Sequence, residues 1–464
     1  MPRAYIRVCL AYRVPSPEAE AQALLRLEAF VRRILDAKPY LAGWVVAAKD
    51  PGQQEGKVEV RFTVNDLDDF PCLQTRSFSH DEIPFDYQQL DRDGLPPSAI
   101  KPELVSALPE SADEDRAPAF RVQANLVDGG LIVSFYLHHC ISDGTGMGLL
   151  ISGDILHDDF AFQRDLKSSS HTVPDLSERL ACFAKLKSVV RGALSWSSPN
   201  LLSDRHIDYK HALPSEAMAR DASPPGRGCI FTFPDEKLSE LRASLKAELT
   251  MRNPALELTT TDALQTLLWH HMTSARRPSL VEAYGTKSSK LLTPVNIRKK
   301  LDKDKCLDDD YFGSAVDFSC AELSLEHLQR TDHASMTFTA LAVHEAIRKV
   351  DDSYVRAAIA LANSTDPTVD VRDLQASNMN RSTGADMYIT SWKNLRLYEA
   401  DLDLGLGPPD WVRKPWSKDP GSCIIMPKDP RKHAVEVVVQ MTEDDMARLL
   451  MNQQFISMVS RVIE

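Results

Sequence analysis

The chain has 464 residues, of which 43% are hydrophobic and 26% charged, and its formal net charge at pH 7 is −12. These values are typical of a globular protein with two or three domains, and the acidic balance argues against nucleic acid as the main partner. The chain has only 19 glycines. It lacks the patterns GxGxxG and GxxxxGK[ST], which argues against a glycine-rich phosphate loop.

Targeting and redox signals point to the cytoplasm. The sequence has no run of 18 apolar residues, so we expect no membrane-spanning helix and no membrane partner. Arg7 and Arg13 interrupt the first apolar stretch, and no small-residue cleavage site follows it, which disfavours a signal peptide. The eight cysteines lie far apart and form no CxxC. They indicate buried thiols rather than a disulfide framework or a zinc site.

Strands and helices alternate along the first half. A strand is expected at 6–14, followed by a helix that Ser16 caps and Pro17 begins. Apolar residues at helical spacing continue that helix until shortly before Pro39. Further elements are expected in chain order: a half-buried strand at 58–62, a buried strand at 131–137 and a helix at 176–194.

The second half starts again after a segment rich in proline and polar residues. We therefore expect an N-terminal lobe at 1–200, a crossover linker at 201–228 and a C-terminal lobe at 229–464. A helix at 262–275 is expected to be capped by Thr260 or Thr261. The other expected strands are 229–233, 291–297, 314–318, 387–392, 423–426 and 434–441, and the other expected helices are 236–249, 334–350, 353–362 and one starting at Thr442 with Asp445.

The most informative stretch is a hydrophobic strand that runs into His138 and His139, with Asp143 and Gly144 four and five residues after the second histidine. A strand end aims a side chain well, and a neutral imidazole there can take a proton from a hydroxyl or amine. Asp143 could orient that imidazole or could hold the loop. Two adjacent histidines are by themselves more often structural. No metal site is expected, because no cysteine, glutamate or third histidine lies at ligand spacing.

The HHxxxDG pattern resembles two related groups, the BAHD-type CoA-dependent acyltransferases and the condensation domains of peptide synthetases. Other segments resemble the BAHD motifs in the correct order, and the strand entry at 122–132 resembles the fungal branch that includes the trichothecene 3-O-acetyltransferases. These segments are KPYLAG at 38–43, TTDAL at 260–264 with Trp269 and Ala275-Arg276, Asn296-Ile297-Arg298, YFGSA at 311–315, ITSW at 389–392 and DLDLGLG at 401–407. In the last segment Asp403, Gly405 and Gly407 match the family's DFGWG pattern, whereas Leu404 and Leu406 replace its Phe and Trp.

The resemblance implies a chloramphenicol acetyltransferase-like fold: mixed α/β, with two similar lobes that each carry a mixed β-sheet and packed helices, and a solvent channel between them. His139 would be the general base in that channel. Asp143 would point away from the substrate and pair with Arg298, and Gly144 would belong to the structural part of the motif. Ser391 and Trp392 are candidate channel or oxyanion residues, with plain packing as the alternative.

The resemblance also implies acyl-CoA, with acetyl-CoA as the default, as a co-substrate rather than a permanent cofactor. Thr260 or Thr261 could bond its pantetheine arm, and Arg276 and Lys290 could meet its phosphates. The expected function is transfer of the acyl group to a hydroxyl or amine of a small natural product by a monomeric enzyme. The alternatives are a free-standing condensation-type enzyme with a carrier-bound donor, and a non-acylating cyclase or binding protein on the same scaffold.

Overall fold

A computed structural model describes residues 4–48, 56–63, 65–66, 71, 73–79, 81–108, 116–157, 209–211, 226–252, 256–301, 307–362, 374–376, 385–415 and 419–464. Contacts divide the chain into two units. Unit 1 contains Met1–Arg191, Asp302–Ala315 and Asn394–Trp416, and unit 2 contains Gly192–Leu301, Val316–Lys393 and Ser417–Glu464. Within the described ranges, no helix combines the length and the hydropathy that crossing a membrane requires.

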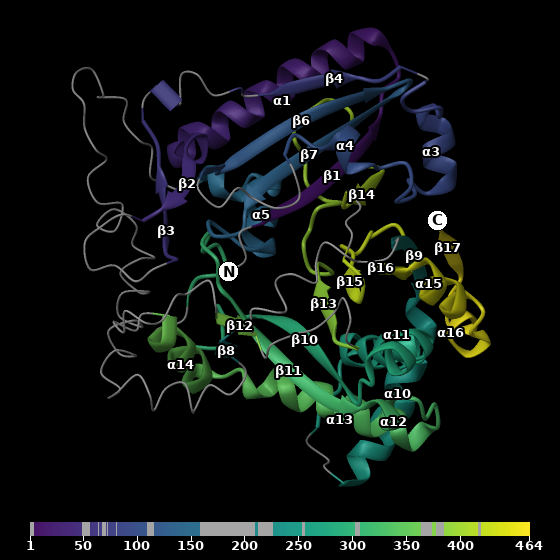
Figure 1. The fold of residues 1–464 in the computed structure, drawn as a ribbon. Helices are drawn as coiled ribbons and strands as arrows, with labels where there is room; N and C mark the ends of the chain where they lie inside the picture. The colour runs from purple at the N-terminus through teal and green to yellow at the C-terminus, as the bar shows by residue number, and fades with distance from the viewer. Residues whose placement is uncertain are drawn as a thin grey trace. The chain divides into compact units, whose positions relative to one another are not determined.

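Unit 1 is built on a five-stranded sheet in the order β14-β1-β7-β6-β4 (Figure 1). Its central strand is β7 (Gly130–His138), which pairs antiparallel with β1 (Tyr5–Arg13) along the whole length of both strands. β6 (Phe120–Val127) continues the sheet antiparallel to β7, and β4 (Gln74–Ser77) lies parallel to β6. The other edge of β1 is covered by β14 (Trp411–Arg413), which comes from the far end of the sequence.

Helix α1 (Pro17–Ala37) begins as the sequence predicts: Ser16 accepts a hydrogen bond from the backbone N–H of Ala19, and Pro17 is the first helical residue. The strand predicted at 131–137 is confirmed as β7, in which every residue is buried. The remaining described elements of unit 1 are η1 (Pro39–Ala42), β2 (Trp44–Ala47), β3 (Val58–Arg61), α3 (Tyr87–Asp93), α4 (Pro102–Val105), β5 (Arg116–Pro118), α5 (Gly144–Ser152) and η2 (Asp154–His157).

Unit 2 is built on a seven-stranded sheet in the order β11-β10-β13-β15-β16-β9-β17. These strands are β11 (Val316–Ser324), β10 (Ser288–Asn296), β13 (Met387–Ser391), β15 (Ser422–Ile425), β16 (Ala434–Thr442), β9 (Gly226–Pro234) and β17 (Arg461–Ile463). The neighbours β10, β13 and β15 are parallel, and two antiparallel steps through β16 give β9 the same direction. The carboxyl ends of these four strands therefore lie at one edge of the sheet.

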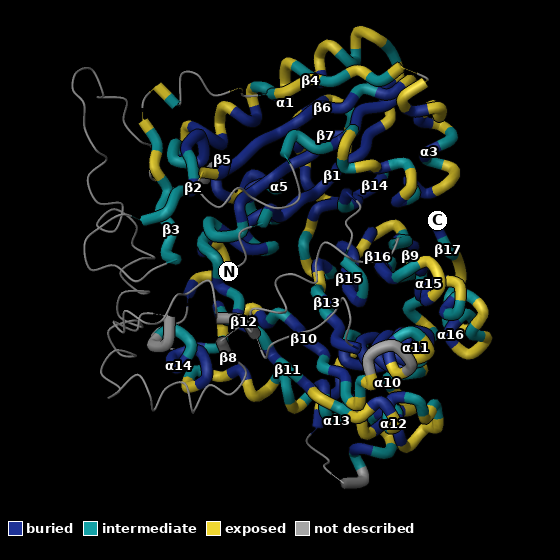
Figure 2. The backbone as a smooth tube through the Cα atoms, viewed as in Figure 1, coloured by how far each residue is buried: buried dark blue, intermediate teal, exposed yellow. Residues whose placement is uncertain are grey.

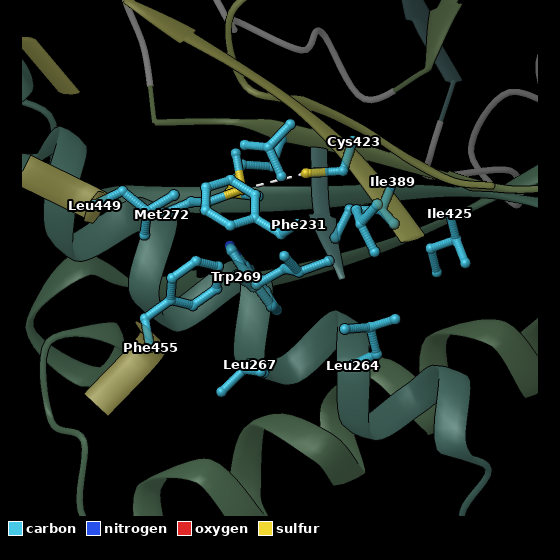
Figure 3. Close-up of a cluster of buried hydrophobic side chains, with 14 of the residues drawn as sticks. Phe231, Leu264, Leu267, Trp269, Met272, Ile389, Cys423, Ile425, Leu449 and Phe455 are labelled. Atoms are coloured by element: carbon cyan, nitrogen blue, oxygen red, sulfur yellow. Dashed lines mark hydrogen bonds between the residues drawn. The ribbon is translucent and has the colours of Figure 1, made fainter. Parts of the chain in front are cut away.

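The core of unit 2 lies between this sheet and its helices, where dark blue segments concentrate in Figure 2. Trp269 is fully buried, and the ring of Phe231 meets the ring of Phe455 edge-on with centroids 5.1 Å apart (Figure 3). The other described elements are α10 (Asp235–Arg252), α11 (Thr260–Tyr284), α12 (Leu325–Leu328), α13 (His333–Lys349), α14 (Asp352–Ala362), α15 (Glu443–Leu450), α16 (Gln453–Ser457) and the paired strands β8 (Tyr209–His211) and β12 (Leu374–Ala376).

Helix α11 corrects two predictions. Its N-cap is Thr259, which forms a reciprocal capping box with Asp262, so Thr260 and Thr261 are helical residues rather than the cap. The helix also continues nine residues beyond 275 to Tyr284, with Pro278 inside it. That proline removes a backbone donor from the helix, which is unfavourable. Burial of Leu280, two residues later, against other unit 2 residues offsets this cost, so the helix continues.

Two predicted segments fall largely outside the described residues. The helix at 176–194 lies wholly outside, and only 209–211 and 226–228 of the predicted linker are described, the latter as the start of β9. The lobe boundaries stay a prediction. The segments 302–315 and 394–416, which those boundaries assign to the C-terminal lobe, make their contacts within unit 1.

Candidate active site

The two histidines after β7 have different surroundings. His138 is 1% exposed, and its ring meets the ring of Tyr5 edge-on with centroids 5.4 Å apart. Its Nδ1 accepts a hydrogen bond from the backbone N–H of Cys140 at 3.1 Å, which places the ring proton of the neutral form on Nε2. His138 therefore packs the end of the strand and shapes the turn.

His139 is half-buried and is held by its backbone N–H, which donates to the carbonyl of Ala4 at 2.8 Å. Its Nδ1 is buried and has no hydrogen-bond partner in the part of the chain that the structure describes. Burial lowers the pKa of the imidazole from its usual 6.5, and this effect outweighs the opposing influence of nearby backbone groups and of Asp143. The ring is therefore neutral at pH 7 and can accept a proton.

Asp143 is fully buried and uses both carboxylate oxygens on backbone donors. Oδ1 accepts from the N–H of Gly146 at 3.0 Å, which caps α5, and Oδ2 accepts from the N–H of Ala315 at 2.8 Å. Since Nδ1 of His139 has no partner among the described residues, Asp143 does not hydrogen-bond that atom. Of the two roles left open by the sequence, this geometry favours holding the loop.

The segment 311–315 is the second half of this anchor. The hydroxyl of Ser142 donates to the carbonyl of Phe312, 170 positions later in the chain. A Cβ on Gly146 would lie 1.7 Å from Ser142 Oγ and 2.6 Å from that carbonyl, so only glycine fits there. The predicted motif residue Gly144 is the first residue of α5. The loop after His139 and the YFGSA segment therefore form one closely packed structure within unit 1.

The DLGLG segment forms a turn in unit 1. Asp403, Gly405 and Gly407 all have positive φ, at 56°, 78° and 77°, and Leu404 is 2% exposed. The exposed carboxylate of Asp403 meets Arg26 at 3.3 Å. The segment thus combines a left-handed backbone with a buried aliphatic side chain. This is compatible with the structural role predicted for Asp403, Gly405 and Gly407.

Arg298, the predicted partner of Asp143, belongs to unit 2. It is 1% exposed, and both its backbone N–H and its Nη1 contact Oδ1 of Asn296, at 3.0 and 3.3 Å. The predicted pair joins residues of different units, and it stays a prediction.

The predicted oxyanion candidates lie at the end of β13 in unit 2. Trp392 is 8% exposed and its backbone N–H donates to the carbonyl of Ile425 at 2.8 Å, which is the arrangement of a packed strand residue. Ser391 is exposed, and its hydroxyl accepts from the backbone N–H of Lys393 at 3.4 Å. Their proposed roles in catalysis stay predictions.

The predicted CoA contacts separate into two kinds. Arg276 is 2% exposed and donates to the carbonyl of Asp386 at 3.1 Å, so its guanidinium supports the fold, and its role as a phosphate contact stays a prediction. Lys290 is half-buried in β10, where its backbone N–H donates to Asp386 Oδ1. Thr260 and Thr261 lie in the first turn of α11 and are half-buried.

Lys393 is a residue of interest that the sequence analysis missed. Its ammonium group donates to Oγ1 of Thr260 at 3.2 Å, beside the first turn of α11. The only signal in the sequence was a lysine directly after the ITSW segment, and such a lysine is usually part of a solvated surface. In the described ranges, no group of three or more histidine, cysteine, aspartate or glutamate residues could hold a metal ion.

Comparisons with known proteins give matches along most of the chain. A model of the Transferase family matches residues 89–456, and a model of the trichothecene 3-O-acetyltransferase-like N-terminal domain matches residues 4–153. An eremophilane O-acetyltransferase of Penicillium rubens is 26% identical over 486 residues, covering 98% of this chain and 95% of the relative. A trichothecene 8-O-acetyltransferase of Fusarium sporotrichioides is 24% identical over 473 residues, covering 94% and 92%.

Solved structures share the fold. F. sporotrichioides TRI101 complexed with Coenzyme A and T-2 matches with a TM-score of 0.76 at 19% identity, covering 100% of this chain and 96% of that one. Vinorine synthase matches with a TM-score of 0.59 at 16% identity, covering 99% and 91%. The mixed α/β, acyltransferase-like fold class predicted from the sequence is thereby confirmed. Because the first family model spans most of the sequence, this chain belongs to the Transferase family.

Proposed function

We propose that the chain is a CoA-dependent O-acyltransferase that moves an acyl group, by default acetyl, from acyl-CoA to a hydroxyl of a small natural product. The observation that carries this proposal is the neutral, half-buried imidazole of His139, held between a rigid strand and an anchored loop. Membership of the Transferase family and the O-acetyltransferase names of the relatives support acyl transfer to oxygen.

In the proposed reaction His139 takes the proton of the acceptor hydroxyl as the oxygen attacks the thioester carbonyl. A tetrahedral oxyanion forms, and its collapse breaks the carbon–sulfur bond and releases CoA thiolate. The thiolate then takes the proton from His139, so the base is regenerated and no acyl-enzyme is needed. General-base catalysis of this kind contributes roughly 10²–10⁴-fold in rate, and positioning must supply most of the rest.

Asp143, Ser142 and Gly146 act here as positioning residues, since they hold the loop that follows His139 to the segment 311–315. Cys140 stays outside the proposed chemistry, because direct transfer needs no second nucleophile. We also propose, from the sequence, a monomeric cytoplasmic enzyme. The buried thiols of Cys9, Cys229 and Cys423 support a reducing compartment.

The test mixes purified protein with acetyl-CoA and a panel of hydroxylated terpenoids and related natural products, and follows thiol release together with the mass of the product. His139→Ala should lower kcat by about 10²–10⁴-fold. A matched control is His333→Gln, which changes an exposed histidine of unit 2 and should keep full activity. Full activity of His139→Ala would contradict the mechanism, and absence of turnover with every CoA ester would contradict the function.

A further inference from the structure

Ser314, in the segment 311–315, carries a hydroxyl group that is buried without a partner. Its Oγ is shielded from solvent and forms no hydrogen bond in the part of the chain that the structure describes. A buried polar atom of this kind destabilises the fold, and folded proteins contain few of them. Alanine at the same position would avoid that cost. Functional sites are where proteins most often retain such atoms.

Ser314 lies beside the loop that follows His139, and both belong to unit 1. The next backbone N–H, that of Ala315, donates to Asp143 Oδ2 at 2.8 Å, and standard bond lengths then place the Cα of Ser314 within about 5 Å of that oxygen. Burial lowers the pKa of the His139 imidazole, and Asp143 is close enough to oppose that shift. Ser314 and His139 are therefore on two chain segments that one buried carboxylate holds together.

Two neighbouring polar side chains are already used to hold the loop. Ser142 donates to the carbonyl of Phe312, and Asp143 accepts two backbone N–H groups. By contrast, Nδ1 of His139 and Oγ of Ser314 are both buried and have no partner among the described residues. One of these two atoms belongs to the proposed general base, and a role in the same reaction accounts for the other.

The proposed reaction needs a hydrogen-bond donor in addition to its base. When the acceptor oxygen attacks the thioester, an electron pair of the C=O bond moves onto the carbonyl oxygen. His139 takes the proton of the acceptor, so another group must stabilise the charge on that oxygen. Serine hydroxyls are among the donors that do this in acyl transfer, and their O–H rotates to face an acceptor.

We propose that Ser314 is a catalytic residue whose hydroxyl donates a hydrogen bond to the carbonyl oxygen of the acyl thioester as that oxygen becomes negatively charged. This inference rests on the proposed function and adds a second residue to its mechanism. The hydroxyl keeps its proton throughout. When the tetrahedral intermediate collapses, the electron pair returns to the carbonyl, the carbon–sulfur bond breaks, and CoA thiolate takes the proton from His139.

The experiment compares the steady-state kinetics of Ser314→Ala and Ser314→Cys with those of the unmodified protein. The substrates are acetyl-CoA and the hydroxylated terpenoid that the unmodified protein acetylates fastest. Ser314→Ala should lower kcat by about 10²–10³-fold and change the KM for acetyl-CoA by less than about twofold, because the contact forms mainly in the transition state. Ser314→Cys keeps the size of the side chain but donates weakly, so it should also lose most of its turnover. The acid limb of the pH profile should not move, because His139 is intact.

Stability gives a second readout, which a structural role would move in the opposite direction. Loss of an unpartnered hydroxyl should leave the melting temperature of Ser314→Ala unchanged or higher, while its turnover falls. The matched control is Thr232→Val in β9 of unit 2, which removes another buried Oγ that has no partner among the described residues. This variant should be at least as stable as the unmodified protein and should keep full turnover.

The outcomes separate this inference from the function on which it rests. If the unmodified protein transfers acetyl to no acceptor, the proposed function fails and the inference fails with it. If transfer occurs and Ser314→Ala or Ser314→Cys keeps full kcat, the function stands and the oxyanion role is wrong. A raised KM with unchanged kcat, a lower melting temperature together with lost turnover, or a shifted acid limb would also overturn the proposal. These three results would make Ser314 a binding residue, a structural residue, or a residue that acts through His139.

Discussion

Replacing Asp143 separates a loop-holding role from an imidazole-orienting one. In Asp143→Ala, α5 loses its cap, which costs about 1 kcal/mol, and the N–H of Ala315 loses its acceptor in a buried site, which costs roughly 1–3 kcal/mol. The free energy of unfolding should therefore fall by about 2–4 kcal/mol. Asp143→Asn keeps a good cap but turns an amide N–H₂ towards one of the two backbone donors, so it should lose roughly 1–3 kcal/mol.

A protein with two units need not unfold in one step, so the assay follows amide hydrogen exchange at Gly146 and Ala315. A loss of 2 kcal/mol in local stability speeds exchange by about 30-fold. Turnover should fall in the same variants, because the loop beside His139 loses its anchor. Asp403→Asn is the control, since that carboxylate is 70% exposed and should contribute little. Native exchange rates combined with lost turnover in Asp143→Asn would refute the loop-holding argument.

Three further predictions follow from buried groups. Gly146→Ala places a Cβ 1.7 Å from a serine hydroxyl and should lower the free energy of unfolding by about 1–3 kcal/mol. Gly148→Ala should be tolerated, because the nearest atom to its Cβ is 3.3 Å away. Equal melting temperatures of these two variants would contradict this. Burial lowers the pKa of His270 and of His271 to about 4, below an unfolded value near 6.5. The free energy of unfolding should therefore be highest above pH 6.5 and should fall between pH 6.5 and 4 by up to about 3 kcal/mol for each ring. Denaturation at several pH values tests this, and a stability that does not change with pH would contradict it. Because the pKa of His139 is also lowered, the acid limb of kcat/KM should lie below pH 6.5, and a limb above that pH would exclude this imidazole as the base.

Local sequence signals predicted elements well where the physics is local. Ser16 before Pro17 marks the start of α1, and the apolar run at 131–137 marks a strand buried on both faces, because these features depend on neighbouring residues alone. The end of α11 was misplaced for a non-local reason. Pro278 is locally unfavourable, and burial of Leu280 against residues distant in sequence carries the helix past it.

The candidate active site also combines features that local sequence predicts with contacts that it does not. The HHxxxDG pattern pointed to His139, but it left the role of Asp143 open, because the N–H of Ala315 lies 172 positions away and no local pattern shows that contact. Arg276 and Lys393 illustrate the limit for charged residues. A basic side chain in a sequence usually predicts a solvated surface residue. Only the fold shows that Arg276 is buried and donates to a backbone carbonyl, and that Lys393 donates to a residue in the first turn of a helix.

The pairing of β1 with β14 has a consequence for synthesis of the chain. Cys9 lies opposite Arg413, so one edge of β1 stays uncovered until about 400 further residues have been made, which takes roughly 20–80 s at ordinary translation rates. An uncovered strand edge is a template for unwanted pairing with other chains. Nascent protein should therefore depend on chaperones late into its synthesis. Gene fusions or exchanges that separate residues 1–200 from 394–416 should yield an N-terminal half that aggregates.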